Sequence, residues 1–269
     1  MAKTIAIANQ KGGVGKTTTT INLGASLAAA DLRILVVDLD PQGNCTSGLG
    51  IDKNALEGTV YEVLTDGADP HGIICPTELE TLKVLPSNRD LIGATIELLD
   101  TPAREFRLDQ ALKGLAGEFD YILIDCPPAL GILTVNALVT ADSLLIPIQS
   151  EFFALEGLSE LIGTLNRIRQ GLNPRLEIEG VLLTMHDERL NLCNQIHQEV
   201  RGYFGDQVFE TIVPRNVRLA ESPGFGQPIL LYAARSKGAD SYLELAHEIL
   251  KQSPAPQPAH EPVSMELAS

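Results

Sequence analysis

A glycine-rich run between an apolar segment and a helix-period segment restricts the fold of this chain more than any other feature. Lys11-Gly12-Gly13-Val14-Gly15-Lys16-Thr17 follows the apolar residues 4–8 and leads into residues 17–30, where apolar side chains recur at helical spacing. Glycines let backbone N–H groups converge on a phosphate chain, because a Cβ would obstruct both the tight turn and the close approach. The run therefore predicts a strand, a phosphate-binding loop and a helix, in that order.

The residues that end the loop carry side chains suited to a nucleotide. We expect Lys16 to reach the β- and γ-phosphates as a point charge, and the Thr17 hydroxyl to bind Mg²⁺ at the positive end of the helix. Thr18 completes the predicted nucleotide-binding segment, which begins at Lys11. The alternative is a glycine-rich turn without a ligand, and the complete Gly-Lys-Thr ending argues against it.

Further apolar runs predict strands that are buried on both faces, as in a parallel sheet. They are residues 34–37, 121–124, 143–148 and 178–183, and 82–85 is expected to add another. Helix-period stretches alternate with them at residues 90–99, 108–115, 133–138, 155–168, 196–204 and 236–251. This alternation predicts an α/β fold, a doubly wound and mostly parallel sheet flanked by helices.

The composition fits a cytosolic globular protein. With 269 residues, 44% of them hydrophobic, the chain can bury a substantial core. The apolar run after Lys3 is too short for a signal peptide or a membrane span. The four cysteines lie far apart, which predicts free thiols in a reducing compartment. Prolines punctuate residues 253–269, so we predict one domain over residues 1–252 and a disordered tail after it.

Two of the predicted strands end in acidic residues. Asp38 and Asp40 follow residues 34–37, where a doubly wound fold places its ligand crevice, although both could instead cap the next turn. Asp125 ends the run 121–124, which is the Walker B form. A buried carboxylate without a partner would cost on the order of several kcal/mol. We therefore expect Asp125 to bind Mg²⁺, through water.

The loop departs from the general pattern G-x-x-x-x-G-K-[ST], because Gln10 stands at the place of the first glycine and Lys11 follows it. The run resembles the deviant Walker A loop, K-G-G-x-G-K-[ST], of the ParA/MinD superfamily of ATPases. That resemblance implies that Lys11 crosses a dimer interface to the partner's nucleotide and couples ATP to dimerisation. Such a lysine would neutralise charge that develops during phosphoryl transfer. An exposed lysine beside the loop is the alternative interpretation.

The resemblance extends to about Lys251, so residues 1–252 are expected to form a P-loop ATPase domain. It is closest to the chromosomal Soj/ParA partition group, on the strength of residues 40–50 and 213–223. The overlapping segment of residues 37–44 resembles switch I. It implies that Asp40 lies near Mg²⁺ as a metal-site residue and positions or activates the attacking water, supported by Asp38.

The second segment, residues 213–223, implies the contacts to the base and contains one of the two predicted DNA contacts. In the family it lines the adenine pocket, which assigns Pro214 and Asn216 to adenine. The chain lacks the N-K-x-D guanine signature, so ATP is the predicted nucleotide. The matching DNA-binding positions are Arg189 and Arg218, although Glu188 dilutes the positive potential at Arg189, which could instead be a solvated surface residue.

The formal charge of −15 argues against a surface that is basic all round. Dimerisation would reconcile this charge with DNA binding, because it doubles the arginine patch. The leading hypothesis is therefore a cytoplasmic, nucleoid-associated ATPase for chromosome or plasmid segregation. Its ATP-dependent homodimer would bind DNA nonspecifically until a ParB/Spo0J-like partner stimulates hydrolysis.

Three alternatives remain from the sequence. A MinD-like membrane ATPase would need a C-terminal amphipathic anchor, and the proline-rich tail argues against one, so we expect no membrane binding. A relative of the nitrogenase iron protein would need thiolate ligands at a dimer axis, for which Cys126 alone is poorly placed. A regulatory or scaffold protein without hydrolysis is the third. The five histidines show no ligand spacing.

Overall fold

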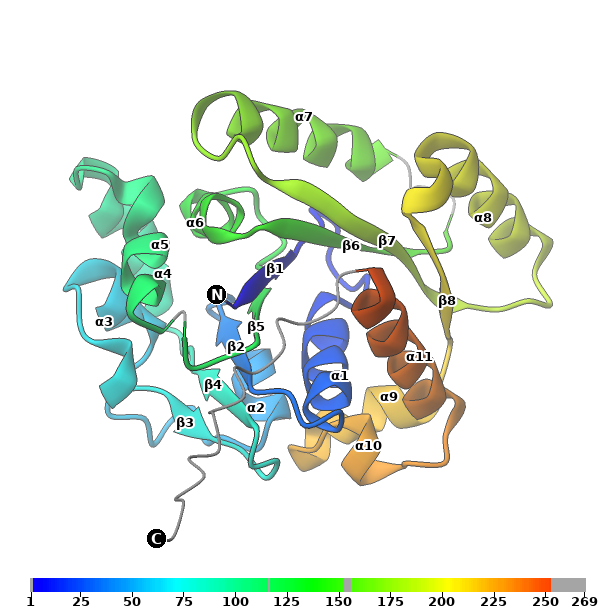
Figure 1. The fold of residues 1–269 in the computed structure, drawn as a ribbon, viewed down its shortest axis with the longest axis horizontal. Helices are drawn as coiled ribbons and strands as arrows, with labels where there is room; N and C mark the ends of the chain where they lie inside the picture. Colours follow the sequence, from blue (N-terminus) through cyan, green and yellow to red (C-terminus); the bar gives the residue numbers. More distant parts are fainter. Residues whose placement is uncertain (1, 116, 152–155, 253–269) are drawn as a thin grey trace, which may run out of the picture.

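A single twisted sheet runs through the molecule (Figure 1). The computed structural model describes residues 2–115, 117–151 and 156–252. The predicted disordered tail, residues 253–269, lies outside the described residues. The strands are β1 (Lys3–Ile7), β2 (Ile34–Asp38), β3 (Cys75–Pro76), β4 (Leu82–Leu85), β5 (Tyr121–Asp125), β6 (Ser143–Gln149), β7 (Glu177–His186) and β8 (Val208–Pro214).

The strand order is β3-β4-β2-β5-β1-β6-β7-β8, and every neighbouring pair is parallel except β3 with β4. The order reverses at β1, which lies in the middle of the sheet. In an open α/β sheet a ligand binds beyond the carboxyl ends of the strands at such a reversal. The loop after β1 therefore starts at the expected binding crevice.

Helices cover both faces of the sheet (Figure 1). Helices α3 to α8 pack on one face, and α1, α2 and α9 to α11 pack on the other. The α-helices are α1 (Lys16–Ala28), α2 (Asn44–Gly48), α3 (Val60–Thr65), α4 (Leu91–Glu97), α5 (Arg107–Leu112), α6 (Ile132–Thr140), α7 (Glu156–Gly171), α8 (Asn191–Phe204), α9 (Val217–Glu221), α10 (Ile229–Tyr232) and α11 (Lys237–Gln252). The short 3₁₀ turns are η1 (Pro70–Gly72), η2 (Leu98–Asp100), η3 (Arg104–Phe106), η4 (Lys113–Leu115), η5 (Gly205–Gln207) and η6 (Ser222–Phe225).

The strands alternate their side chains between two apolar clusters. In β1, Ala6 joins the cluster under α3 to α8, whereas Ile5 and Ile7 join the cluster under α1 and α11. Both faces of these strands are buried, which is why the sequence shows continuous apolar runs rather than alternation. The predicted doubly wound α/β fold is confirmed.

Two local features outside the crevice also shape the fold. Gly180 of β7 admits the ring of Phe209 from β8, because a Cβ at position 180 would lie 2.4 Å from that ring. His71 of η1 contacts Asp69 through Nδ1 and Glu118 through Nε2, each at 2.7 Å. The bonds to Asp69 and Glu118 raise the pKa of His71.

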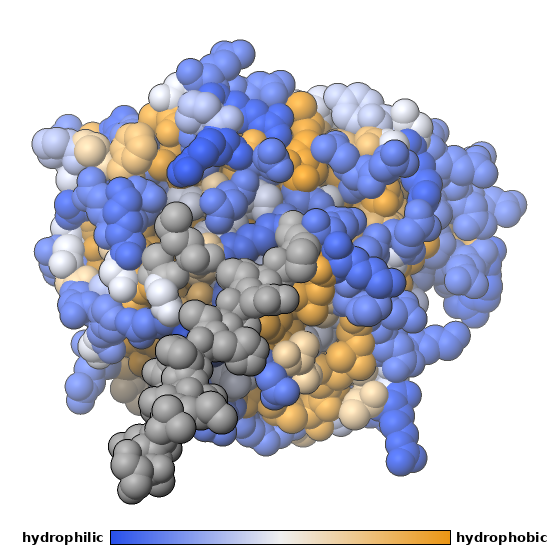
Figure 2. All heavy atoms as spheres, viewed as in Figure 1, coloured by the Kyte–Doolittle hydropathy of each residue, from blue (hydrophilic) through white to orange (hydrophobic). Residues whose placement is uncertain are grey.

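Hydrophilic side chains cover most of the face in Figure 2, and hydrophobic ones show mainly in patches between them. Among the described residues, no helix is both long enough and apolar enough to span a membrane.

Candidate nucleotide-binding site

The loop between β1 and α1 has the backbone of a phosphate cradle. Gly13 (φ 76°) and Gly15 (φ 91°) adopt the left-handed conformation that glycine accepts without a Cβ penalty. A Cβ at Gly12 or Gly13 would meet nothing within 4 Å, so the loop is open around these two residues. No side chain caps the first turn of α1, which leaves its N–H groups for an anion.

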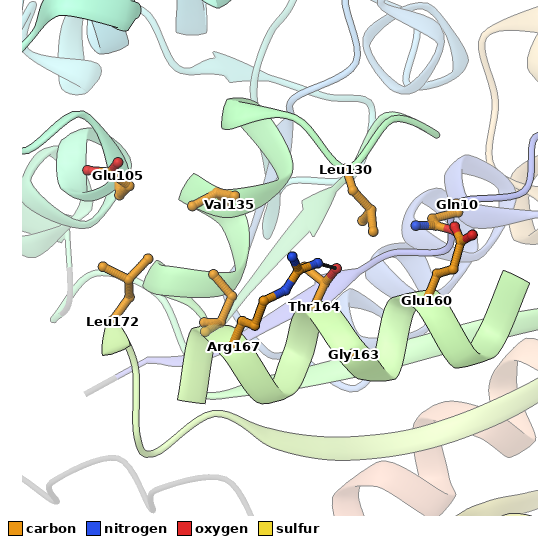
Figure 3. A pocket seen from close by; sticks show the side chains of 10 residues that line it. Gln10, Glu105, Leu130, Val135, Glu160, Gly163, Thr164, Arg167 and Leu172 are labelled. Atoms are coloured by element: carbon orange, nitrogen blue, oxygen red, sulfur yellow. Dashed lines mark hydrogen bonds between the residues drawn. The ribbon is translucent and has the colours of Figure 1, made fainter. Parts of the chain in front are cut away.

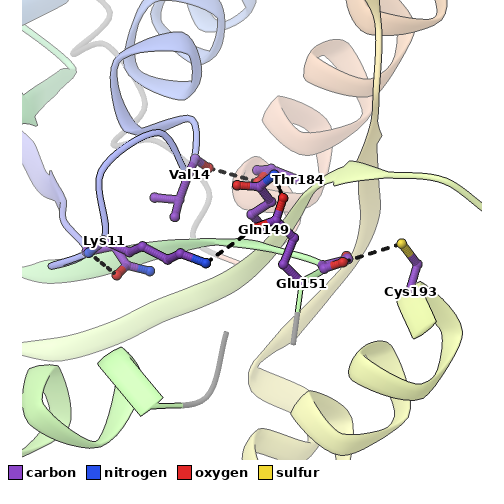
Figure 4. A network of polar contacts seen from close by, with 8 residues as sticks. Lys11, Val14, Gln149, Glu151, Thr184 and Cys193 are labelled. Carbon is purple, nitrogen blue, oxygen red and sulfur yellow. Dashed lines mark hydrogen bonds and ion pairs between the residues drawn. The ribbon is translucent and has the colours of Figure 1, made fainter. Parts of the chain in front are cut away.

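Two hydrogen bonds tie the loop to β6 and β7, and a third lies within it; the bond to β7 is drawn in Figure 4. The Asn9 side chain accepts from the Lys11 N–H at 3.0 Å and donates to the Pro147 carbonyl on β6 at 2.8 Å. The Thr184 hydroxyl on β7 donates to the Val14 carbonyl at 2.8 Å. The cradle is therefore held in shape by the sheet itself.

Lys16 begins α1 and turns its side chain back into the loop. Its ammonium group donates to the Lys11 carbonyl at 3.1 Å, and only 7% of the residue is exposed. Burial lowers the pKa of Lys16, whereas the charges of Asp125 and other nearby groups act to raise it. A buried ammonium needs anionic partners to offset its desolvation, and phosphate oxygens would supply them.

Asp125 ends β5 and lies against the first turn of α1. It is fully buried and accepts hydrogen bonds from the hydroxyls of Thr17 at 2.7 Å and Thr20 at 3.1 Å. Burial raises the pKa of Asp125 well above its usual range, and the nearby Asp38 adds to this effect. A carboxylate and a hydroxyl are hard oxygen ligands of the kind that Mg²⁺ prefers.

Mg²⁺ would need oxygens beyond those of the chain. Among the described residues, no group of three or more histidines, cysteines, aspartates and glutamates is arranged to hold a metal ion. Mg²⁺ commonly keeps several waters and takes substrate phosphates besides one or two carboxylates. The donor set of Thr17 and Asp125 therefore fits Mg²⁺ that enters with a nucleotide.

Asp38 ends β2 next to Asp125, its register partner on β5. It is fully buried and receives the N–H of Asp40 at 3.0 Å, the N–H of Thr46 at 2.8 Å and the hydroxyl of Thr46 at 2.7 Å. Burial raises the pKa of Asp38, and the hydrogen bonds from Thr46 lower it. Asp38 thus fixes the segment that carries Asp40.

Asp40 is half-buried and lies at the open edge of the crevice. Its carboxylate accepts from the Gln42 N–H at 2.9 Å, and its carbonyl accepts from the Ser87 hydroxyl at 2.9 Å. The predicted role at the metal and the attacking water stays a prediction, but the structure places Asp40 and Asp125, at the ends of the neighbouring strands β2 and β5, close to Lys16 at the start of α1.

Lys11 has a different environment from Lys16. Its ammonium group pairs with Glu151 at 3.4 Å, with side-chain exposures of 35% and 49% (Figure 4). Glu151 also accepts from Gln149, which ends β6. A pair this exposed contributes about 0–1 kcal/mol. Lys11 is therefore only weakly held to its own subunit.

A cavity of about 240 Å³ opens beside the phosphate loop. The predicted adenine residues Pro214 and Asn216 line it, together with Thr18 of the loop. The remaining lining residues are Gly15, Thr184, Met185, Val213, Arg215, Leu219, Ala220 and Tyr242. The side-chain oxygen of Asn216, Oδ1, caps α9 by accepting the Arg218 N–H at 2.8 Å. The side-chain nitrogen, Nδ2, is therefore the group left for a ligand.

The two predicted DNA-binding arginines are exposed, and each is paired within the chain. Arg189 binds Asp187 through Nε at 2.8 Å and Nη2 at 2.7 Å, which lowers the pKa of Asp187 to about 2. Arg218 binds Glu221 at 2.9 Å. They line separate hollows, so the monomer does not join them into one site.

A larger hollow of about 620 Å³ lies between α6 and α7 (Figure 3). Gln10 and Leu130 line one part of it, and Glu105 and Leu172 line another. It contains none of the predicted nucleotide-binding residues. The smaller cavity beside Gly15 and Thr18 is therefore the candidate site for the base.

Fold and site together define the class: a P-loop ATPase with a deviant Walker A loop. The family model described as an AAA domain matches residues 2–178. The chain is 57% identical to a chromosome partitioning protein ParA of Myxococcus xanthus, over 96% of this chain and 91% of that protein. It is 56% identical to the sporulation initiation inhibitor protein Soj of Bacillus subtilis, over 93% and 98%.

A solved structure agrees with this classification. The crystal structure of cobyrinic acid a,c-diamide synthase from Mycobacterium smegmatis with bound ATP analog and magnesium is 37% identical, with a TM-score of 0.83. The match covers 94% of this chain and 96% of that one. The chain belongs to the ParA/Soj family of chromosome-partitioning ATPases, within the ParA/MinD superfamily.

Several residues of the site had no signal in the sequence. Thr20 and Thr46 hold the two buried carboxylates, and Thr184 holds the loop. The sequence does not show that Thr20 of α1 contacts Asp125 of β5, or that Thr184 of β7 contacts the phosphate loop, since these partners are far apart along the chain. Thr46 lies within the run 40–50, but its bond to Asp38 has no pattern of its own in the sequence.

Proposed function

We propose that this chain is an ATP-driven switch for chromosome partition. ATP binding brings two copies together, the homodimer binds DNA without sequence preference, and hydrolysis releases it. The observation that carries this proposal is the contrast between the two loop lysines. Lys16 is buried in its own site, whereas Lys11 is exposed and only weakly paired.

The chain's own residues divide the work of hydrolysis. The loop N–H groups and Lys16 bind the phosphates of ATP, and Pro214 and Asn216 hold adenine. Thr17, Asp125 and Asp40 would hold Mg²⁺, Asp125 through water, and the ion would supply positive charge to neutralise the transferred phosphoryl group. Asp40 orients the attacking water, because Asp38 fixes its backbone in the crevice.

Lys11 acts on the partner's nucleotide. Lys16 already supplies a buried cation to the subunit's own phosphates, and Lys11 points away from that site toward Glu151. A second cation that arrives with the partner would stabilise the charge that develops in the transition state, as arginine fingers do. Hydrolysis is thereby tied to dimerisation.

DNA binding uses Arg189 and Arg218 of both subunits. A carboxylate of the same chain partly neutralises the positive potential of each arginine, which keeps the monomer's affinity for DNA phosphates low. The dimer doubles the number of arginines, and every added phosphate contact steepens the dependence of binding on salt. The protein then acts in the cytoplasm, on the nucleoid.

A ParB-like DNA-binding protein is the partner that stimulates hydrolysis. A slow basal rate leaves the dimer on DNA, and the partner ends that state locally. The relatives support a chromosomal rather than a plasmid cargo, since the ParA of M. xanthus is named for chromosome partitioning.

The test uses Asp40→Ala in the full chain with Mg²⁺ and ATP at low salt. If Asp40 orients water but does not bind ATP, the variant should hydrolyse no ATP and accumulate as a dimer retained on a nonspecific duplex. The control is the double variant Lys16→Ala/Asp40→Ala, which should stay monomeric and free. The proposal fails if Asp40→Ala binds ATP yet remains monomeric and ignores DNA.

A further inference from the structure

Met185 of β7 adopts a backbone conformation that its side chain disfavours. Its φ of 50° lies in the left-handed region, where a Cβ crowds the following carbonyl. The register with β8 pairs Leu183 with Ile212 and then His186 with Pro214. Thr184 and Met185 therefore stand opposite one residue of β8, which is the arrangement of a β-bulge.

Both neighbours of Met185 are held in place. The Thr184 hydroxyl donates to the Val14 carbonyl of the phosphate loop at 2.8 Å. The carbonyl of the buried His186 accepts from the Arg215 N–H at 3.0 Å, and its ring contacts the Ser150 hydroxyl at 3.2 Å. The disfavoured conformation is thus fixed from two sides, one on the phosphate loop and one on the segment that carries Pro214.

The bulge places Met185 in the wall of the base cavity. Its companions there include Pro214 and Leu219, which are apolar, and Asn216, which offers an amide nitrogen. In a regular strand consecutive side chains point to opposite faces, and a bulge re-aims one of them, commonly next to an active site. Backbone strain that the surroundings enforce concentrates at ligand-binding positions.

We propose that Met185 is a specificity-determining residue that packs against the face of a purine base. The thioether is flexible and polarisable and makes favourable contacts with aromatic rings. A purine offers it a larger ring surface than a pyrimidine does, so the contact favours ATP over CTP. This inference rests on the proposed function, in which the cavity takes the base of the nucleotide.

The test compares the binding of three ligands to the full chain with Mg²⁺: ATP, CTP and inorganic tripolyphosphate. Titration calorimetry of Met185→Ala should show ATP binding weakened about five- to tenfold, as for the loss of one sulfur–aromatic contact and its buried area. CTP should lose less, and tripolyphosphate should bind as it does to the wild type. Met185→Leu, which keeps the volume, should retain most of the preference for ATP.

Two further variants separate base recognition from damage to the fold. Met185→Gly should lose as much affinity for ATP as Met185→Ala does. It should melt at the same temperature as Met185→Ala or higher, because glycine accepts the left-handed backbone. Leu99→Ala, which truncates an exposed apolar residue in η2 on the other side of the sheet, should leave all three affinities unchanged.

The outcomes distinguish this inference from the function on which it rests. If Asn216→Ala weakens ATP binding while Met185→Ala keeps the wild-type ratio of ATP to CTP affinity, the base occupies the cavity and Met185 does not read it, which overturns the inference. If neither variant changes ATP binding, the base lies elsewhere, and both the inference and the proposed adenine contacts fall.

Discussion

Replacing Thr46 by valine tests how the buried carboxylate of Asp38 is accommodated. The Thr46 hydroxyl donates to Asp38 at 2.7 Å and accepts the Ser87 N–H at 2.9 Å, and the whole residue is buried. Valine has nearly the same shape but can do neither. Thr46→Val therefore removes two hydrogen bonds without creating a large cavity.

The expected cost follows from those two bonds. A hydrogen bond to a charged group contributes about 1.5–3 kcal/mol, and a buried N–H left unpaired costs about 1–3 kcal/mol. Together they predict a loss of about 3–5 kcal/mol in the free energy of unfolding. A domain of ordinary stability, about 5–15 kcal/mol, should still fold with that deficit.

The loss should also depend on pH. Burial raises the pKa of Asp38 to about 6 in the folded chain. Asp38 is protonated in both states below about pH 4, so its charge costs no stability there. The cost of burying the charge grows as the pH rises through the folded pKa. The Thr46 hydroxyl holds that pKa down, so removing it raises the pKa further. The deficit of Thr46→Val should therefore grow from pH 5 to pH 8.

Urea unfolding followed by circular dichroism at pH 5, 6.5 and 8 measures this deficit. Thr46→Ser is the control, because it keeps the hydroxyl and should lose only about 1 kcal/mol for a buried methyl group. A loss below about 1 kcal/mol for Thr46→Val at pH 8, or a larger loss at pH 5 than at pH 8, would show that the Thr46 hydroxyl does not stabilise the buried Asp38 carboxylate.

Three further predictions follow from contacts outside the nucleotide site. The wild type should melt at a higher temperature than His71→Gln, and the difference should be largest below about pH 6.5, where a histidine in the unfolded chain is charged. The difference should shrink as the pH rises through the raised pKa of His71 in the folded chain. The same difference at pH 5.5 and at pH 8.5 would contradict this prediction. Gly180→Ala should lower the free energy of unfolding by about 1–3 kcal/mol, because its Cβ would overpack against Phe209. Gly163→Ala in α7, where a Cβ meets nothing within 4 Å, should raise it by up to about 1 kcal/mol. The same unfolding midpoint for the two variants would contradict this prediction. Asp187→Asn should release Arg189 and tighten DNA binding of the ATP-loaded dimer at low salt, with a steeper salt slope in a fluorescence titration; weaker binding would assign Asp187 another role.

The long buried strands could be predicted well from the sequence. Residues 82–85 match β4, and residues 34–37 and 121–124 each fall one residue short of the acid that ends the strand. β2 and β5 are buried at every position, so their apolar runs are unbroken, whereas the run of β4 is interrupted by the exposed Lys83. The runs also end where the chain needs a carboxylate at the crevice.

Other elements left too little pattern to find. Strand β8 contains Glu210 and Thr211 among its apolar residues, and it was not predicted. Helices α2, α3, α9 and α10 have six residues or fewer, which is too short for a helical period to show. Helix α8 begins at Asn191, five residues before the predicted start, because Cys193 is the one buried residue of its first turn and the apolar Leu192 beside it is exposed.

The candidate site divides in the same way. Lys16, Thr17 and Asp125 belong to local motifs, and the structure brings the first turn of α1 against the end of β5. The left-handed Met185 depends on the pairing of β7 with β8, which no local motif records. The pairing of Arg189 with Asp187 depends on side-chain orientation in a turn, so the sequence suggested a freer arginine than the structure contains.

A mixing experiment shows whether Lys11 of a second subunit completes each nucleotide site. Lys11→Ala and Asp40→Ala should each hydrolyse almost no ATP alone, the first lacking the lysine and the second lacking the residue that orients water. In a mixed dimer, the Asp40→Ala subunit presents its Lys11 to the intact Asp40 site of the other. ATP hydrolysis should therefore return when the two variants are combined at equal concentration. A mixture as inactive as its components, although both bind ATP and dimerise with each other, would contradict the account.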